Sequence, residues 1–306
     1  MSGQGMSIAV LGPGGVGGLV AGALEHTGTP VVVVARESTA ELIEARGLRV
    51  DSVRVGQFLA RPRAVSRLQE PIDVLIVATK AAGLAAALER IVVAPKLVLA
   101  LLNGLDHMAP LRERFGMDTV AAGSIRVEAD RPEPGVVVQT SPFLRIDMAW
   151  RGPEMREDLE VLALVLERAG IPARLLDSEP QVLWGKLVRL NALACMTSAY
   201  DKLLGEIRDT PALRAELVAA IEEGCAVAKA EGAAIAPTSP LGELNDAHAT
   251  LGSSMQRDIA AGRPPELDAI AGAVLRAGKR KGVPCPTITR LAGMIAARAG
   301  VPAPVV

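Results

Sequence analysis

Aromatic residues and a surplus of either charge are both scarce in this sequence. Phe, Trp and Tyr together make up only 2% of its 306 residues, which leaves few aromatic platforms on which single-stranded nucleic acid could stack. The formal net charge is −1, so the chain lacks the basic surface that binding to a nucleic acid backbone requires. We therefore expect no nucleic-acid partner.

Cysteine is also rare, and the sequence contains only Cys195, Cys225 and Cys285. An odd number of widely separated cysteines fits neither a disulfide framework nor a zinc-ligand spacing. We interpret these residues as small apolar side chains in a reducing compartment, and we expect no metal site.

Long apolar runs are absent as well. The most apolar stretch, residues 91–102, is interrupted by Pro95 and falls short of the ~20 residues that cross a bilayer. Residues 1–5 run into a strand-like segment and do not resemble the basic and apolar regions of a signal peptide. The sequence therefore predicts a protein with no membrane segment and a cytoplasmic location.

Apolar residues make up 50% of the chain, and its length favours two domains over a single core. In the first half, apolar runs alternate with amphipathic stretches, as in βαβ units on a parallel sheet. The expected strands are Ile8–Leu11, Val31–Ala35, Val74–Ala78 and Val98–Leu102. The expected helices are Val16–His26, Thr39–Ala45, Leu84–Ile91, Met108–Phe115 and Glu154–Ala169.

The remaining segments complete this outline. Residues 48–59 read as a small hairpin, and residues 120–148 as antiparallel strands that complete the edge of the sheet, with a turn at 132–135. After about Leu176 the strand patterns stop and helical patterns follow. We predict an α/β N-terminal domain over residues 1–176 with a mostly parallel sheet, and an all-helical domain over residues 177–306 that carries the substrate site and the catalytic groups.

A glycine-rich motif follows the first expected strand and precedes the first helix. Gly12, Gly14 and Gly17 form a GxGxxG frame, which permits a tight turn, close approach of a pyrophosphate and close packing of the helix. Free N–H groups at the start of that helix would bind the phosphates. Such turns also occur for packing alone, but this context favours a Rossmann-type domain that binds a dinucleotide through Gly12, Pro13, Gly14, Gly15, Val16 and Gly17.

The end of the second strand bears on cofactor choice. Arg36 follows this strand, and its guanidinium suits the 2′-phosphate of NADP. Glu37 comes next and could instead bind the ribose of NAD, so both cofactors remain open, with NADP favoured.

Four later motifs resemble those of the ketopantoate reductase (2-dehydropantoate 2-reductase) family. They are Thr79-Lys80, Asn103-Gly104, the run Trp184–Leu187, and residues 253–259 continuing to Glu266–Ile270. The resemblance covers nearly the whole chain, and the last motif is the most specific. It implies NADPH-dependent reduction of a 2-oxo acid or related ketone, with 2-dehydropantoate as the leading candidate.

The resemblance also implies roles for single residues. Lys186 would be the general acid that protonates the ketone oxygen, and Glu266 would lie near that oxygen. Asn103 would contact both cofactor and substrate, Lys80 the cofactor, and Ser254 the substrate carboxylate. A cation placed where negative charge develops stabilises that charge, so a lysine suits this chemistry.

Each of these residues also has a purely structural interpretation. Lys186 could be a solvated lysine on a helix, and Glu266 could be a carboxylate favoured by a helix dipole. Ser254 could be an N-cap, and Asn103 with Gly104 could be an ordinary turn.

The sequence departs from the family pattern in the expected substrate pocket. Leu190, Ala194 and Leu204 stand where the family usually has Asn, and Ala271 replaces another. Asn191 lies one position off, about 100° around a helix, and is our third candidate for substrate binding. Fewer polar groups should discriminate poorly for a substrate hydroxyl, which leaves a less polar 2-oxo acid or ketone as an alternative acceptor.

Two other functions are compatible with the sequence. One is a different two-domain NAD(P)-dependent hydroxyacid dehydrogenase, and the other is a non-catalytic NADP-binding sensor. Retention of Lys186, Ser254 and Glu266 argues against the sensor, because a sensor has no need of a proton donor. The sequence leaves the choice between a monomer and a homodimer open.

Overall fold

The chain forms two compact units in a computed structural model that describes residues 5–306. Unit 1 comprises the residues up to 102 together with 107–182, and unit 2 comprises residues 103–106 and 183–306. The short segment 103–106 therefore belongs to the helical unit, although its neighbours in sequence belong to the other. The domain boundary that we place near Leu176 stays a prediction.

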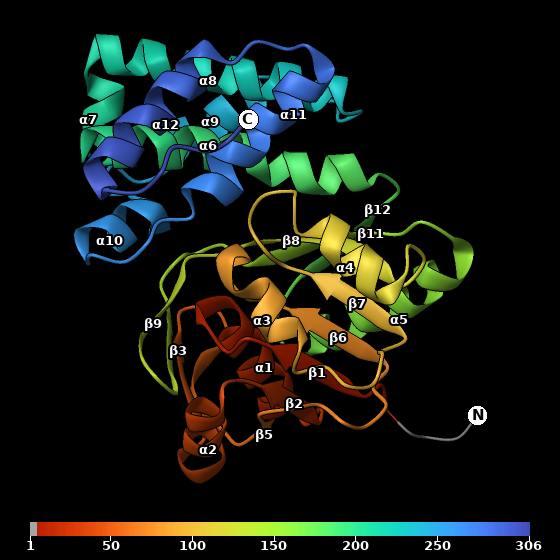
Figure 1. The fold of residues 1–306 in the computed structure, drawn as a ribbon. Coiled ribbons are helices and arrows are strands. Elements are labelled where there is room, and N and C mark those ends of the chain that lie inside the picture. Colours follow the sequence, from red (N-terminus) through yellow and green to blue (C-terminus); the bar gives the residue numbers. More distant parts are fainter. Residues whose placement is uncertain (1–4) are drawn as a thin grey trace. The chain divides into compact units, whose positions relative to one another are not determined.

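Unit 1 is built on an eight-stranded sheet with the order β12-β11-β8-β7-β6-β1-β2-β5 (Figure 1). Adjacent strands are parallel except for β8 and β11. All residues of β1, β6 and β7 are buried, as expected for parallel strands covered on both faces. The predicted mostly parallel sheet is confirmed. Its strands are β1 (Ile8–Leu11), β2 (Val31–Val34), β5 (Arg63–Val65), β6 (Val74–Val77), β7 (Leu97–Ala100), β8 (Val120–Arg126), β11 (Arg145–Ala149) and β12 (Ala173–Leu176).

The helices of this unit connect the parallel strands. The first expected helix is confirmed and begins in the glycine-rich motif, and the third is shorter than expected. The helices are α1 (Gly15–His26), α2 (Glu37–Arg46), η1 (Ala81–Gly83, a 3₁₀ turn), α3 (Leu84–Leu88), α4 (Met108–Phe115) and α5 (Pro153–Arg168).

A second, four-stranded sheet corrects one of our predictions. It has the order β4-β3-β10-β9 and consists of β3 (Leu48–Ser52), β4 (Gly56–Ala60), β9 (Ala129–Glu133) and β10 (Val136–Gln139). The hairpin at 48–59 is confirmed as β3–β4. Residues 129–139, however, do not complete the main sheet, because β10 pairs in parallel with β3. Helix α1 packs against this second sheet as well as against β1 and β2, and the buried side chains Val50 and Val137 lie close to its glycines Gly22 and Gly18.

Unit 2 contains only helices among its described residues, which confirms the predicted all-helical C-terminal region. Trp184, Val188, Ile221 and Leu291 are among the side chains of its apolar core. Its helices are α6 (Glu179–Tyr200, whose first turn belongs to unit 1), α7 (Leu204–Asp209), α8 (Pro211–Ala230), α9 (Thr238–Asp246), α10 (Ser254–Ala260), η2 (Asp268–Gly272, a π-helical turn), α11 (Ala273–Lys281) and α12 (Pro286–Ala299).

The cysteines are buried inside this helical unit and form no disulfide. Desolvation raises the pKa of the Cys195 thiol to about 12. Desolvation, with a smaller contribution from nearby carboxylates, raises the pKa of Cys225 and of Cys285 to about 11. All three side chains are therefore neutral at physiological pH and pack as small apolar groups.

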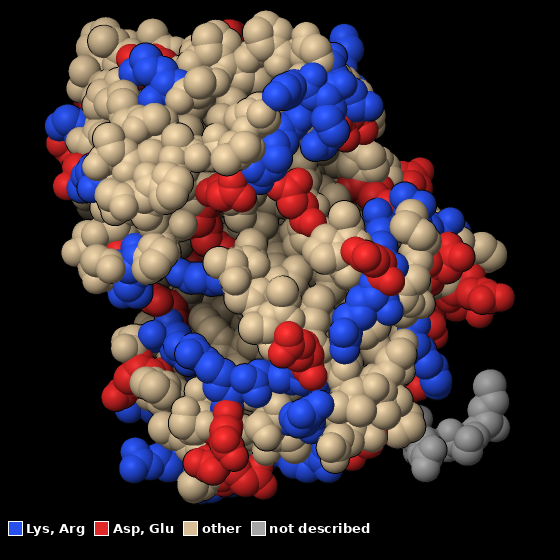
Figure 2. Space-filling model, viewed as in Figure 1, with Lys and Arg blue, Asp and Glu red and all other residues tan. Residues whose placement is uncertain are grey.

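Basic side chains gather over one helix of the C-terminal unit. Figure 2 shows blue side chains gathered over α11, whose last turn carries Lys279, Arg280 and Lys281. Within residues 5–306, no helix combines the length and the apolar character needed to cross a membrane. The same residues include no group of three or more His, Cys, Asp or Glu side chains that could hold a metal ion.

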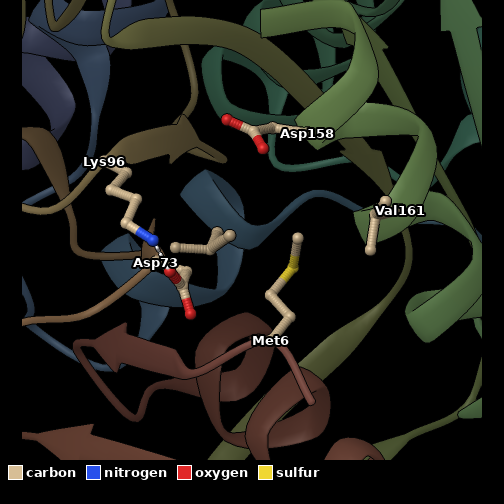
Figure 3. A pocket seen from close by; sticks show the side chains of 6 residues that line it. Met6, Asp73, Lys96, Asp158 and Val161 are labelled. Atoms are coloured by element: carbon tan, nitrogen blue, oxygen red, sulfur yellow. Dashed lines mark hydrogen bonds and ion pairs between the residues drawn. The ribbon is translucent and has the colours of Figure 1, made fainter. Parts of the chain in front are cut away.

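A polar network joins β1 to β6 at the start of both strands. Ser7 donates from its backbone N–H and its hydroxyl to Asp73 Oδ2, at 2.9 and 2.6 Å. Lys96 forms an ion pair with the other carboxylate oxygen, and Figure 3 shows the two side chains meeting in a pocket. The hydrogen bonds from Lys96 and Ser7 lower the pKa of Asp73 to about 2.

This network predicts a specific loss of stability in acid. The pKa of Asp73 is lower in the folded chain than in the unfolded chain, so its contribution is present above about pH 4 and is lost as the pH falls toward about 2. Because the Asp73 side chain is 31% exposed, we expect Asp73→Asn to remove only about 1–2 kcal/mol of that pH dependence. Urea denaturation of both proteins at about pH 5 and about pH 3 measures the difference.

Asp158 provides a matched control, because it lines the same pocket but is exposed on α5. Asp158→Asn should keep the acid dependence of the wild type. Equal acid dependence in the wild type and in Asp73→Asn would contradict the assignment to Asp73.

Candidate functional site

The glycine-rich motif forms a tight turn between β1 and α1 in unit 1. Gly12 has φ +93°, a conformation that side-chain-bearing residues rarely adopt, and its N–H donates to the Val34 carbonyl at 3.0 Å. Gly14 is the N-cap of α1 and supplies no side-chain cap. The N–H groups of the first helical turn are therefore available to an anion.

The glycines of the turn differ in how much space surrounds them. A Cβ on Gly17 would lie 2.2 Å from the Gly12 carbonyl oxygen, whereas a Cβ on Gly14 would have no atom within 4 Å. Gly17 thus serves the close contact of helix and turn, and Gly14 leaves open room beside the helix start. Thr79 Oγ1 is buried without a hydrogen-bond partner in the described part of the chain, and Thr79 also contacts the Gly12 position. An open turn with free N–H groups and an unpaired hydroxyl fits the pyrophosphate of a dinucleotide.

Two basic residues follow strands of the same sheet. Arg36 is exposed after β2 and is the N-cap of α2, and Lys80 is exposed after β6. Glu37, the alternative ligand for a ribose, is the first residue of α2 and is also exposed. Both basic residues have the exposure that a contact with a nucleotide phosphate needs, and their cofactor roles stay predictions.

A chain of hydrogen bonds connects three half-buried polar side chains in unit 2. Lys186 Nζ donates to Asn103 Oδ1 at 2.7 Å, and Asn103 Nδ2 donates to Glu266 Oε2 at 3.0 Å. An ammonium group can only donate and a carboxylate can only accept, so these partners fix the orientation of the amide between them. The sequence predicted all three residues, and the structure brings them together from positions 83 and 163 residues apart.

The elements around these residues explain their placement. On α6, Trp184 and Leu187 are each 2% exposed and anchor that part of the helix in the apolar core of unit 2. Lys186 lies between them and is only partly covered. Glu266 lies two residues before the start of η2, where a π-helical turn replaces regular helix. Such turns are frequent at functional sites.

Ser254 is the first residue of α10 and is exposed. The N-cap of α10 is its neighbour Ser253, whose hydroxyl accepts from the Gln256 N–H at 3.1 Å and from the Thr197 hydroxyl at 2.8 Å. The structural alternative of an N-cap therefore belongs to Ser253. Ser254 is left accessible, and its contact with a substrate carboxylate stays a prediction.

Asn191 lies inside the helical core and is 0% exposed. Its Oδ1 accepts from Cys195 Sγ at 3.4 Å, and its Nδ2 has no partner among the described residues. Ala194 and Leu204 are also buried, while Leu190 is partly exposed. In this conformation a substrate could not reach Asn191, so its proposed role would require the core to open.

Replacement of Asn191 distinguishes a structural role in the core from a role in substrate binding. A buried amide with unpaired hydrogens costs about 1–3 kcal/mol, so we expect Asn191→Leu to raise the free energy of unfolding by about 1 kcal/mol. KM for the acceptor should stay unchanged. Urea denaturation and steady-state kinetics measure the two quantities. An increase of KM by about tenfold or more would support substrate contact instead.

Ser254→Ala is the matched control on an accessible residue. It should change stability by less than about 0.5 kcal/mol, as exposed substitutions usually do, and should raise KM for a carboxylate substrate.

Two family models match this chain and together span most of it. "Ketopantoate reductase PanE/ApbA" matches residues 8–148, and "Ketopantoate reductase PanE/ApbA C terminal" matches residues 180–299. The family resemblance seen in the sequence motifs is confirmed.

Individual relatives are distant but match along nearly their whole length. A 2-dehydropantoate 2-reductase from Halobacterium salinarum is 28% identical and covers 95% of this chain and 98% of its own. The crystal structure of a 2-dehydropantoate 2-reductase from Geobacter metallireducens superposes with a TM-score of 0.87 at 26% identity, over 95% of this chain and 99% of that one. A D-mandelate dehydrogenase with NADH and anilino(oxo)acetate has a TM-score of 0.88 at 22% identity, over 96% and 98%, and shares the fold.

Proposed function

This chain belongs to the ketopantoate reductase family, and we propose that it reduces 2-dehydropantoate to pantoate with NADPH. The family is one of oxidoreductases that act on CH–OH groups, and its cofactor is NADPH. The hydrogen-bonded chain Lys186–Asn103–Glu266 carries the proposal, because it places a proton donor, an amide and a carboxylate together as the resemblance implies.

The roles of the two units follow from their chemistry. Unit 1 would hold the nucleotide through Gly12 to Gly17, with Arg36 and Lys80 as phosphate contacts. The bound cofactor supplies a hydride to the carbonyl carbon of the substrate. Lys186 would donate a proton to the carbonyl oxygen, so that the ketone becomes an alcohol.

The other members of the hydrogen-bonded chain would orient the donor and the substrate. Asn103 holds the Lys186 ammonium through its Oδ1 and would contact both cofactor and substrate. Glu266 holds the opposite end of the same amide and so fixes its orientation toward the lysine. Ser254 would hold the substrate carboxylate.

A less polar 2-oxo acid is the second candidate acceptor. Leu190 and Ala194 offer no hydrogen bonds to a substrate hydroxyl, and Asn191 is buried. The D-mandelate dehydrogenase of the same fold is named for a 2-hydroxy acid that carries a phenyl group. A site without hydroxyl partners would lose little affinity for such an acceptor.

The decisive experiment follows NADPH absorbance while the purified protein is offered 2-dehydropantoate and a series of 2-oxo acids with progressively less polar side chains. A preference for 2-dehydropantoate in kcat/KM supports the first candidate, and a preference for an apolar acceptor supports the second. Binding of NADPH without reduction of any acceptor would contradict both and favour a nucleotide-binding sensor. The same series with NADH tests whether Arg36 or Glu37 decides cofactor choice.

We also propose a cytoplasmic location. Its reducing conditions suit a protein whose three cysteines are buried free thiols. Sedimentation of the purified protein distinguishes the monomer from the homodimer.

A further inference from the structure

An arginine outside all the motifs binds residues next to two members of the hydrogen-bonded chain. Arg276 lies on α11. Its Nη2 donates to Asp106 Oδ2 at 2.6 Å, and its Nη1 donates to Asp268 Oδ1 at 2.7 Å. Asp106 is three residues after Asn103, and Asp268 is two residues after Glu266. One guanidinium therefore joins the segments that carry Asn103 and Glu266.

The hydrogen bonds from Arg276 to Asp268 and to Asp106 are of different kinds. The Asp268 side chain is 69% exposed, so its ion pair alone is weak. Arg276 Nη2 also donates to the Asp268 backbone carbonyl at 3.0 Å, which fixes η2 independently of that carboxylate. The Asp106 side chain is 45% exposed and accepts from both Nε and Nη2, at 3.1 and 2.6 Å. Paired donors in the rigid fork of an arginine give geometric specificity that a lysine lacks.

The backbones of the two segments are also in close contact. Gly104 follows Asn103 with φ +85°, and a Cβ there would lie 2.0 Å from the Ala269 carbonyl oxygen in η2. The segment 103–106 therefore packs directly on the π-helical turn that follows Glu266. Arg276 spans this contact from α11, so its hydrogen bonds resist sliding of one segment along the other.

We propose that Arg276 is a positioning residue that clamps segment 103–106 to η2 and thereby keeps Asn103 within hydrogen-bond reach of both Lys186 and Glu266. The clamp itself does not depend on what the protein catalyses. Its effect on catalysis rests on the proposed function of the Lys186–Asn103–Glu266 chain. Misplacement of a group by about 1 Å can cost up to about 100-fold in rate.

The first test uses Arg276→Met, which keeps much of the side-chain length and removes the donors. Lys279→Met is the matched control, since Lys279 lies on the same helix and donates to the Val306 carbonyl but to neither segment. We expect hydrogen exchange of the backbone amides of residues 103–106 to become about tenfold faster in Arg276→Met and to stay unchanged in Lys279→Met. Unchanged exchange in Arg276→Met overturns the clamp, whether or not the protein reduces any acceptor.

The second test connects the clamp with catalysis through a double-mutant cycle. Arg276→Met should lower kcat about tenfold, whereas in the Asn103→Ala background the same change should lower kcat by less than about twofold. Arg276→Lys should restore only part of the kcat that Arg276→Met loses. An equal loss of kcat in both backgrounds, or no loss in an enzyme that is active, overturns the positioning role.

The clamp can still be tested if the variant does not fold or if the proposed function fails. If Arg276→Met does not fold, Asp106→Asn removes one arm of the clamp, and the same exchange and kinetic criteria apply to it. If the wild type reduces no acceptor, the proposed function fails and amide exchange alone decides the clamp.

Discussion

Lys186→Ala is expected to lower kcat by about 10²–10⁴-fold, the usual contribution of a positioned general acid. The variant loses the proton donor and the cation that is hydrogen-bonded to Asn103. The Kd of NADPH should change much less than kcat, because the variant leaves the glycine-rich turn of unit 1 intact. Steady-state kinetics with the preferred acceptor measure kcat, and fluorescence titration measures the Kd of NADPH.

Two controls separate proton donation from a general loss of positive charge. Lys202→Ala removes a partly exposed lysine just beyond the end of α6 that pairs with Glu206, and should leave kcat unchanged. A small primary amine added to Lys186→Ala should restore part of the rate, because it can replace the missing ammonium group. A kcat within about threefold of the wild type would mean that Lys186 is not the general acid.

Gly14→Ala is expected to weaken NADPH binding by about tenfold or more while leaving the stability of the protein almost unchanged. An added Cβ meets no atom within 4 Å, and the backbone at Gly14 has φ −80° and ψ −163°, which alanine adopts readily. The added methyl group would, however, occupy room beside the helix start that a pyrophosphate needs. Titration with NADPH and urea denaturation measure the two effects.

Gly17→Ala is the companion variant, and its main expected effect is on the stability of the protein. Its Cβ would lie 2.2 Å from the Gly12 carbonyl oxygen, so we expect it to cost about 1–3 kcal/mol of stability, as overpacking usually does. If Gly14→Ala bound NADPH as tightly as the wild type, the turn would serve packing alone and the cofactor assignment at Gly14 would be wrong.

The sequence predicted the parallel part of the fold well, because continuous apolar runs and the glycine-rich turn are local signals. It failed where pairing partners are distant. Residues 129–139 have the alternation of edge strands, but nothing local indicates that β10 pairs with β3 to form a second sheet. The short edge strands β5 and β12 were missed because neither is a continuous apolar run, since each contains an arginine and is only partly buried.

The candidate site was predicted unevenly for a similar reason. The hydrogen-bonded grouping of Lys186, Asn103 and Glu266 could be anticipated because motif resemblance carries information on distant contacts, which hydrophobic periodicity does not. Burial of Asn191 depends on which face of α6 meets the core, and a shift of one residue changes that face by about 100°. Arg276 could not be found from sequence, because its contact with Asp106 spans 170 residues and neither residue belongs to a motif.

The burial of every cysteine in unit 2 has a practical consequence. Thiolates are the reactive form, and thiols with pKa values of about 11 to 12 in closed packing should resist alkylating reagents while the helices stay folded. Unit 1 contains no cysteine. The rate at which the chain is alkylated therefore reports transient opening of the helical unit alone, and a ligand that slows this labelling would be one that stabilises that unit.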